Sequence, residues 1–267
     1  DKIFNYEEKL YLIPFNGSNV LIFDKKRESF QQISTAPFDS IKYKFCAATI
    51  YQNTLYMFPE RVAAEIENPY IVVRVDLTGE DVQVVEVDVP VVPAGNPYYE
   101  VFDRQYFVAE GFVYILLQRT NRVLEYSLEE NSTKIYDVGG SENRYATMYM
   151  DGDAFYFIDQ DGDVTMWDKQ DDRFSKYENQ ISGYTVENKS FAAFSASFKH
   201  GDRVYFVPRF ANKVLCFDNT IIKESFFSSE VLGCSNIVER KGIARYFLDD
   251  AMKNGKLYLW DFSSYKF

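Results

Sequence analysis

Short runs of hydrophobic residues, separated by polar turns, follow one another along most of the chain. Two of them, at residues 10–13 and 20–23, flank the pair Asn16-Gly17. This pair is typical of tight hairpin turns because both residues tolerate a positive φ. The runs lack the 3.6-residue periodicity of amphipathic helices. We therefore predict that residues 10–30 contain two antiparallel strands joined at Asn16-Gly17.

The predicted hairpin recurs along the chain. Aligning its first strand places a tyrosine at intervals of roughly 40 to 60 residues, which is typical of propeller blades built from short strands. The aligned tyrosines are Tyr11, Tyr56, Tyr114, Tyr156, Tyr205 and Tyr258. A leading strand is expected at residues 45–51, 106–109, 145–150 and 191–198, and a trailing strand at 82–87 and 134–138. The pattern predicts an all-β protein, a six-bladed β-propeller of four-stranded antiparallel blades. Seven blades would require strands that the sequence does not show.

The second strand of each hairpin tends to end in an aromatic or apolar residue followed by Asp. Phe23-Asp24 is followed six residues later by Phe30, and Trp167-Asp168 is followed by Phe174 at the same spacing. This spacing resembles the Kelch-type β-propeller, whose units carry a tryptophan in the last position. The resemblance implies a single propeller domain over residues 1–267, which we expect to be part of a longer parent chain.

The intervals between units vary because some connections are long. Insertions are expected at residues 60–70, 88–100, 181–189 and 230–244. Residues 3–6 supply an apolar segment ahead of Tyr11 that can serve as the leading strand of the first unit. In the last link, Ile243, Tyr246, Phe247 and Ala251 fit either a strand or one face of a helix, and the expected sixth unit favours the strand.

Composition and charge narrow the class of partner. Aromatic residues make up 18% of the chain, which suits strands, and the net charge is −11. That charge argues against nonspecific binding to nucleic acid or to anionic membranes, and no apolar run is long enough to span a bilayer. The three cysteines, Cys46, Cys216 and Cys234, have no CxxC spacing and form no disulfide framework.

Motifs for catalysis and cofactors are absent from the sequence, so no cofactor is predicted. There is no P-loop, no GxGxxG and no zinc spacing. His200 is the only histidine, which excludes a metal site of several histidines. The acidic run at residues 159–163 superficially resembles a calcium loop, but Asp161-Gly162 aligns with Asn16-Gly17 and favours a hairpin tip. Acidic residues are abundant enough to leave a carboxylate-pair hydrolase open.

Basic residues recur beside aromatic residues where leading strands begin, and further arginines fall in the hairpin loops. In a propeller these two sets of loops open on the same face, so the cations would surround the mouth of the central channel. The predicted ligand-binding residues are Lys44, Arg61, Arg104, Arg119, Arg144, Tyr145, Lys189, Arg209 and Arg245. The alternative is that these cations mark strand ends and pair with neighbouring carboxylates.

We therefore expect a noncatalytic binding module that presents a loop-rich propeller face to a protein or to a glycan or other anionic ligand. Neither nucleic acid nor a membrane is expected as a partner. The alternative is a carbohydrate-active propeller enzyme, a hydrolase or lyase, with carboxylates converging in a central pocket. A purely structural protein would instead offer a flat polar face without a pocket.

Overall fold

The computed structural model describes residues 2–14, 19–34, 45–59, 70–79, 82–87, 102–117, 119–140, 142–189 and 191–225, with four two-residue strands between 246 and 261. At residues 70–71, 82–87, 102–104, 225 and in the last four strands, only the backbone is described. By its contacts the chain forms two units. Unit 1 comprises residues 1–117 and 122–137, and unit 2 comprises residues 118–121 and 138–267.

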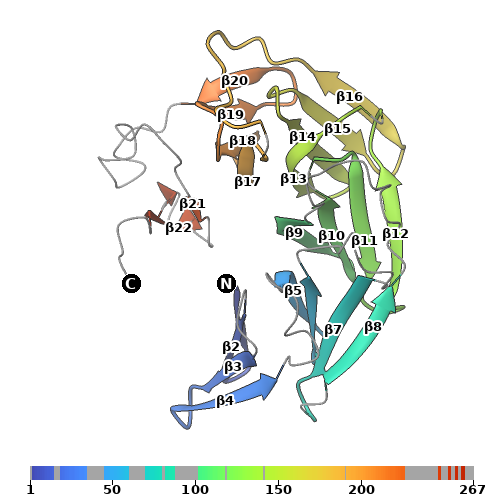
Figure 1. Cartoon of the computed structure of the whole chain (residues 1–267), viewed down its shortest axis with the longest axis vertical. Helices are drawn as coiled ribbons and strands as arrows, with labels where there is room; N and C mark the ends of the chain where they lie inside the picture. The colour runs from blue at the N-terminus through green and yellow to red at the C-terminus, as the bar shows by residue number, and fades with distance from the viewer. Residues whose placement is uncertain are drawn as a thin grey trace. The chain divides into compact units, whose positions relative to one another are not determined.

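Unit 1 contains three four-stranded antiparallel sheets, in each of which neighbouring strands follow one another in sequence (Figure 1). The first sheet consists of β1 (Lys2–Tyr6), β2 (Lys9–Ile13), β3 (Asn19–Asp24) and β4 (Ser29–Ser34). The second consists of β5 (Phe45–Tyr51), β6 (Thr54–Pro59), β7 (Tyr70–Asp76) and β8 (Val82–Val87). The third consists of β9 (Phe102–Ala109), β10 (Phe112–Leu117), β11 (Arg122–Ser127) and β12 (Ser132–Asp137).

The core of unit 1 lies between neighbouring sheets, whose first strands are adjacent: β1 lies beside β5, and β5 beside β9. Tyr11 and Ile22 of the first sheet pack with Leu55 of the second in one buried cluster. Phe58 of the second sheet and Tyr126 of the third share another, with their rings 5.2 Å apart and nearly perpendicular. Because a middle sheet has a neighbour on both faces, its strands read as continuous apolar runs rather than as alternating ones.

Unit 2 contains two more four-stranded sheets of the same antiparallel order. The fourth sheet consists of β13 (Tyr145–Asp151), β14 (Ala154–Asp159), β15 (Val164–Asp168) and β16 (Arg173–Tyr177). The fifth consists of β17 (Phe194–His200), β18 (Arg203–Pro208), β19 (Val214–Phe217) and β20 (Ile222–Ser225). The first strands β13 and β17 lie side by side, and the Ser197 hydroxyl donates a hydrogen bond to the Met148 carbonyl at 2.5 Å. Ile158, Phe206 and Phe217 belong to the shared core.

Four further strands close the described part of the chain. β21 (Tyr246–Phe247) pairs with β24 (Trp260–Asp261), and β22 (Met252–Lys253) pairs with β23 (Lys256–Leu257). Tyr246–Phe247 is therefore a strand and not part of a helix, which is the alternative favoured by the expected sixth unit. The rest of that unit, including Tyr258, lies outside the described residues. The described part of the chain contains no helix with the length and apolar character needed to cross a membrane.

Most predicted strands are confirmed within the described residues. The strands predicted at residues 45–51 and 82–87 coincide with β5 and β8, and residues 3–6 fall within β1. The leading strand predicted at 191–198 begins three residues later, at Phe194, because residues 191–193 belong to the preceding loop. The turn residues Asn16-Gly17 lie outside the described residues. Among the described residues, Cys46 and Cys216 form no disulfide, and both are buried, as expected for core residues.

Candidate functional site

At one end of the sheets of unit 2, the connections between strands form a hydrogen-bonded surface that we call the loop face. It comprises residues 119–121, 138–140, 142–145, 159–163, 178–189, 191–194 and 208–213. Strand register places these segments together, since Tyr145 pairs with Asp159 in the fourth sheet and Phe194 pairs with Pro208 in the fifth. Most of the predicted ligand-binding residues that the structure describes lie on this surface.

The acidic run at residues 159–163 is the hairpin tip that joins β14 to β15. Asp159 Oδ1 accepts the backbone N–H groups of Asp161 and Asp163, both at 2.9 Å, and Gly162 has a φ of 83°. The predicted hairpin tip is thus confirmed. The Asp159 side chain stabilises this turn by accepting two of its backbone N–H groups. Burial and the charge of Asp163 raise the pKa of Asp159 to about 6. No group of three or more metal-binding side chains occurs among the described residues.

The long connection from β16 to β17 is anchored to this tip. Asp163 accepts the backbone N–H of Asn179 at 2.9 Å and forms an ion pair with Lys176 at 3.1 Å. The Asn179 side chain donates to the Asp161 carbonyl, and the Tyr184 hydroxyl donates to the Gln160 carbonyl, both at 3.0 Å. The connection has no regular secondary structure at this point, but hydrogen bonds from its backbone and side chains attach it to the hairpin tip of the fourth sheet.

The same connection is also tied to the tip of the hairpin between β18 and β19. Asn212 accepts the N–H of Thr185 at 2.9 Å and donates its side-chain amide to the Gly183 carbonyl at 2.8 Å. The backbone N–H of Asn212 donates to the Thr185 carbonyl at 3.0 Å, and Val186 forms an isolated β-bridge with Ala211. The loop face is therefore a set of connections that brace one another across both sheets of unit 2.

An aromatic pair, one ring exposed and the other half-buried, lies beside a guanidinium on this surface. The rings of Phe191 and Phe210 are stacked with centroids 5.5 Å apart, and Phe191 is 51% exposed. The Arg209 guanidinium lies 5.3 Å from the centre of the Phe210 ring and 5.8 Å from that of Phe191. We call these three residues the Arg209 stack. A cation at this distance from an aromatic ring gains about 0.5–1 kcal/mol at an exposed site.

The backbone holds the Arg209 stack in place. The N–H groups of Arg209, Phe210 and Ala211 all point to the Ala193 carbonyl, at 2.8, 3.0 and 3.2 Å. Glu187 donates its own N–H to the Phe210 carbonyl at 2.9 Å. The two loops that supply the stack are thus joined through main-chain groups, which fixes the backbone of Arg209 relative to the loop that carries Phe191.

Two other predicted residues, Arg119 and Arg144, come together around the start of β13. The Arg119 N–H donates to the Tyr145 carbonyl at 2.6 Å, and the Tyr145 N–H donates to the Thr120 carbonyl at 3.1 Å. Arg144 is exposed and donates to the Asn143 carbonyl at 2.8 Å. The prediction that hairpin loops and strand-leading loops share a face is therefore confirmed at this position.

Tyr145 was predicted to bind ligand beside Arg144, but its side chain is buried. Its side chain is 1% exposed, and its ring packs 4.8 Å from that of Phe157. Its hydroxyl accepts from the Asn143 side chain and donates to the Val138 carbonyl. Burial raises the pKa of Tyr145 to about 12. Tyr145 thus contributes to the core beneath the loop face rather than to its surface.

Of the remaining predicted residues, only Lys189 has a described side chain. Lys189 is exposed and lies 3.7 Å from the Asp161 carboxylate, as the alternative of strand-end ion pairs anticipated. The backbone of Arg104 lies in β9, whereas its side chain is not among the described ones. Lys44, Arg61 and Arg245 lie outside the described residues, and the ring of cations stays a prediction.

Sequence reasoning missed the residues that organise the loop face. Phe210 follows the predicted Arg209 directly, and an aromatic residue next to a hairpin arginine was the signal that could have identified it. Asn179 and Asn212 are isolated asparagines in connections, where side chains commonly bond to nearby backbone. Their partners are 16 to 29 residues away in sequence, so no local pattern indicates the contacts.

Comparisons with known proteins agree with the sheet architecture. A streptogramin B lyase structure matches with a TM-score of 0.53 and 12% identity, covering 85% of this chain and 68% of that one. The extracellular domain of the hybrid two-component system BT3049 from B. thetaiotaomicron matches with a TM-score of 0.53 and 12% identity, covering 93% of this chain and 31% of that one. No protein-family model and no curated protein sequence matches the chain.

These matches define the class of protein. The chain is an all-β protein with the fold of the β-propellers, and its five described four-stranded sheets are blades. At 12% identity the likeness concerns the fold alone, and propeller folds host many unrelated functions.

Proposed function

We propose that this chain is a noncatalytic binding module whose loop face takes a protein or glycan ligand bearing acidic groups. The observation that carries the proposal is the Arg209 stack. A guanidinium over two stacked rings offers apolar area and directed N–H donors together, the combination by which arginine recognises carboxylates and other anions. Function in such folds commonly lies in loops held on a rigid scaffold.

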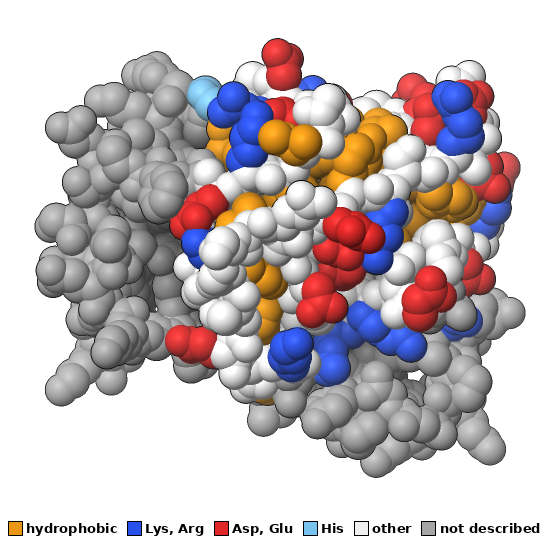
Figure 2. Space-filling view, turned by 90° about the horizontal axis from the view of Figure 1, so that it is seen from above, with side chains coloured by type: hydrophobic (Ala, Val, Ile, Leu, Met, Phe, Trp, Pro, Cys, Tyr) orange, Lys and Arg blue, Asp and Glu red, His pale blue; other side chains and the backbone are white. Residues whose placement is uncertain are grey.

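Preorganisation of the stack supports the same proposal. Loops that must become ordered on binding lose part of the interaction free energy to conformational entropy. Here the Ala193 carbonyl and the contacts of Asn212 hold the loops in position within the unbound chain. Acidic and basic side chains are interspersed over the visible surface in Figure 2, so local groups, rather than the net charge of −11, determine what binds at one place.

The contacts of the nearest carboxylate pair weigh against the enzyme alternative. Asp159 and Asp163 lie at one hairpin tip, and a raised carboxyl pKa is a feature of general acids. However, Asp159 Oδ1 already accepts two backbone N–H groups, and Asp163 is engaged by Asn179 and Lys176. These contacts fit a structural role in the turn.

Two cross-strand contacts support the Kelch-type resemblance as a further proposal. Phe23 pairs with Phe30 across β3 and β4, with ring centroids 4.9 Å apart. Trp167 pairs with Phe174 across β15 and β16, at 6.1 Å and nearly parallel. The recurring spacing therefore corresponds to one packing contact between the two outer strands of a blade.

The test is to screen the intact chain against arrays of acidic glycans and acidic peptides, and then to titrate the ligands that bind. We expect Arg209→Gln and Phe191→Ala to weaken binding about tenfold or more, as truncation of anchor residues does. The matched controls are Arg173→Gln and Phe174→Ala, an exposed arginine and an adjacent exposed phenylalanine on β16 of the same unit. Equal binding by the Arg209 and Arg173 variants, or no binding by the parent chain, would refute the proposal.

A further inference from the structure

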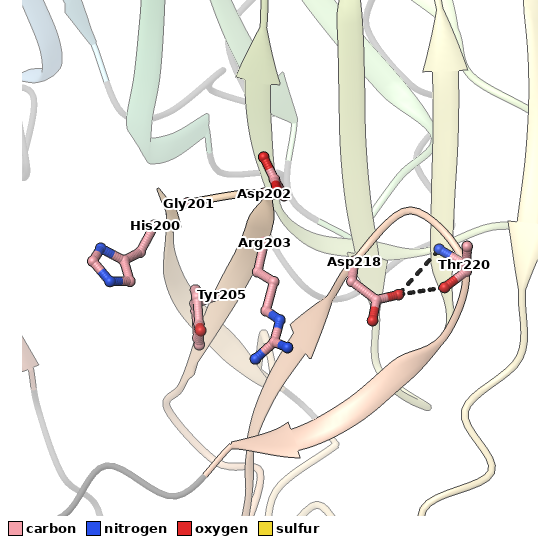
Figure 3. Close-up of a pocket in the computed structure, with 7 residues that line it drawn as sticks. All are labelled: His200, Gly201, Asp202, Arg203, Tyr205, Asp218 and Thr220. Carbon is pink, nitrogen blue, oxygen red and sulfur yellow. Dashed lines mark hydrogen bonds between the residues drawn. The ribbon is translucent and has the colours of Figure 1, made fainter.

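An open pocket lies at the end of the fifth sheet opposite the loop face. It has a volume of about 500 Å³ and is lined by residues 200–203, Tyr205, Asp218 and Thr220 (Figure 3). The turn between β17 and β18 forms one side, and the turn between β19 and β20 forms the other. Its volume falls within the range of about 300–1,000 Å³ that is common for small-molecule sites.

The carboxylate of Asp218 is fully engaged by its own turn. One oxygen accepts from the Thr220 hydroxyl at 2.5 Å and from the backbone N–H of Ile221 at 3.1 Å. The other forms an ion pair with Lys223 at 2.6 Å. These contacts hold the pKa of Asp218 well below its usual range, so the group is charged and already neutralised by a partner.

Arg203 differs from Asp218 because no carboxylate engages it. Among the described residues it has no ion pair within 4.0 Å, and its side chain is exposed. Its guanidinium points into the space between Tyr205 and Asp218, whereas Asp202 points away from it (Figure 3). The neighbouring Tyr205 hydroxyl raises the pKa of Arg203, so the guanidinium is charged.

Tyr205 gives the arginine a fixed neighbour. Its ring is 8% exposed and stacks on Phe198 with centroids 5.1 Å apart and an interplanar angle of 7°. Because the stack fixes the tyrosine ring, the wall of the pocket beside the guanidinium has a set position. A guanidinium presents its N–H donors in a planar fork, which favours two-pronged recognition of an oxyanion over a loose charge contact.

We propose that this pocket is a second binding site, separate from the loop face, for a small organic monocarboxylate held by the Arg203 guanidinium. The site offers one cation without an acidic partner, which matches a single negative charge. A phosphate dianion would meet the Asp218 carboxylate beside the guanidinium and the Asp202 carboxylate at the rim, without a second unpaired cation.

The experiment titrates the intact chain with benzoate and, separately, with phenyl phosphate, using calorimetry or NMR. We expect saturable benzoate binding that weakens about tenfold or more in Arg203→Gln, because a charge-assisted pair of hydrogen bonds is lost. Arg203→Lys retains the charge without the fork and is expected to bind with intermediate affinity. Arg173→Gln, which removes an exposed arginine from the same unit, is the control and should bind as the parent chain does.

Three results would overturn the assignment: no saturable benzoate binding, equal benzoate affinity in Arg203→Gln and the parent chain, or tighter binding of phenyl phosphate than of benzoate. Thermal unfolding of each variant shows whether the fold is intact, and Arg203 is exposed enough for its replacement to leave the core untouched. Since the pocket and the Arg209 stack lie at opposite ends of the sheet, Arg209→Gln should leave benzoate binding unchanged.

Discussion

Replacing Asp159 by Asn should stabilise unit 2 at neutral pH. The carboxylate is half-buried at the hairpin tip beside Asp163, and its pKa is raised from 3.8 to about 6. Asparagine retains an oxygen that can accept the N–H groups of Asp161 and Asp163. The substitution therefore removes the buried charge while keeping the hydrogen bonds that shape the turn.

The magnitude follows from the shift in pKa. A rise of about 2 units, at 1.36 kcal/mol per unit, gives roughly 3 kcal/mol as the cost of the charged form in the folded chain. Because the folded chain binds this proton more tightly than the unfolded chain does, the free energy of unfolding falls as pH rises from about 4 to 6. The Asn variant lacks this dependence. We expect its advantage to be near zero at pH 4 and about 1–3 kcal/mol at pH 7.5.

The assay is urea unfolding at both pH values, followed by the fluorescence of Trp167, which is 2% exposed in the fourth sheet. Asp153→Asn, at an exposed turn of the same sheet, is the matched control and should show no such pH-dependent gain. A variant at position 159 that is less stable than the parent chain at pH 7.5 would show that the charge-assisted bonds to the backbone outweigh burial, contrary to this reasoning.

Two further substitutions probe the scaffold of the loop face. Gly162→Ala should destabilise the chain by more than about 1 kcal/mol, because a Cβ there would lie 2.5 Å from the Asn179 side chain at a φ of +83°. Gly183 has a similar φ of +71°, but a Cβ there would meet no other atom within 4 Å. Gly183→Ala should therefore lose less stability in urea unfolding, and the difference measures the clash with Asn179. Equal losses of stability in the two variants would show that this clash has no effect. Asn212→Ala removes the acceptor of the Thr185 N–H and should accelerate hydrogen exchange at that amide about tenfold. Unchanged exchange would show that Asn212 does not brace the loop.

The architecture was predictable because it depends on local patterns. Short apolar runs bounded by turn residues identified β5 and β8 to the residue. Alignment of Asp161-Gly162 with Asn16-Gly17 correctly placed a hairpin tip where the acidic run alone suggested a metal loop. Both inferences rest on strand burial and on the backbone conformations of turn residues, and these are encoded within a few positions of each other.

The surface of the site was less predictable, for identifiable reasons. Arg144 and Tyr145 are adjacent in sequence, but Arg144 ends the loop and is exposed, whereas Tyr145 begins β13 and enters the core. Phe191 was assigned to a strand from its apolar neighbours, whereas it lies in the loop and stacks on Phe210. The bonds between Asn212 and residues 183–185 join segments whose proximity only the folded sheets establish.

The three N–H groups that converge on the Ala193 carbonyl have an evolutionary consequence. The shape of the hairpin tip is specified by main-chain atoms, which every amino acid with a backbone N–H provides. Side chains at positions 209–211 can therefore change without rebuilding the loop that carries them. Such a tip lets a lineage vary the chemistry of this surface by single substitutions, while the blade below it stays the same.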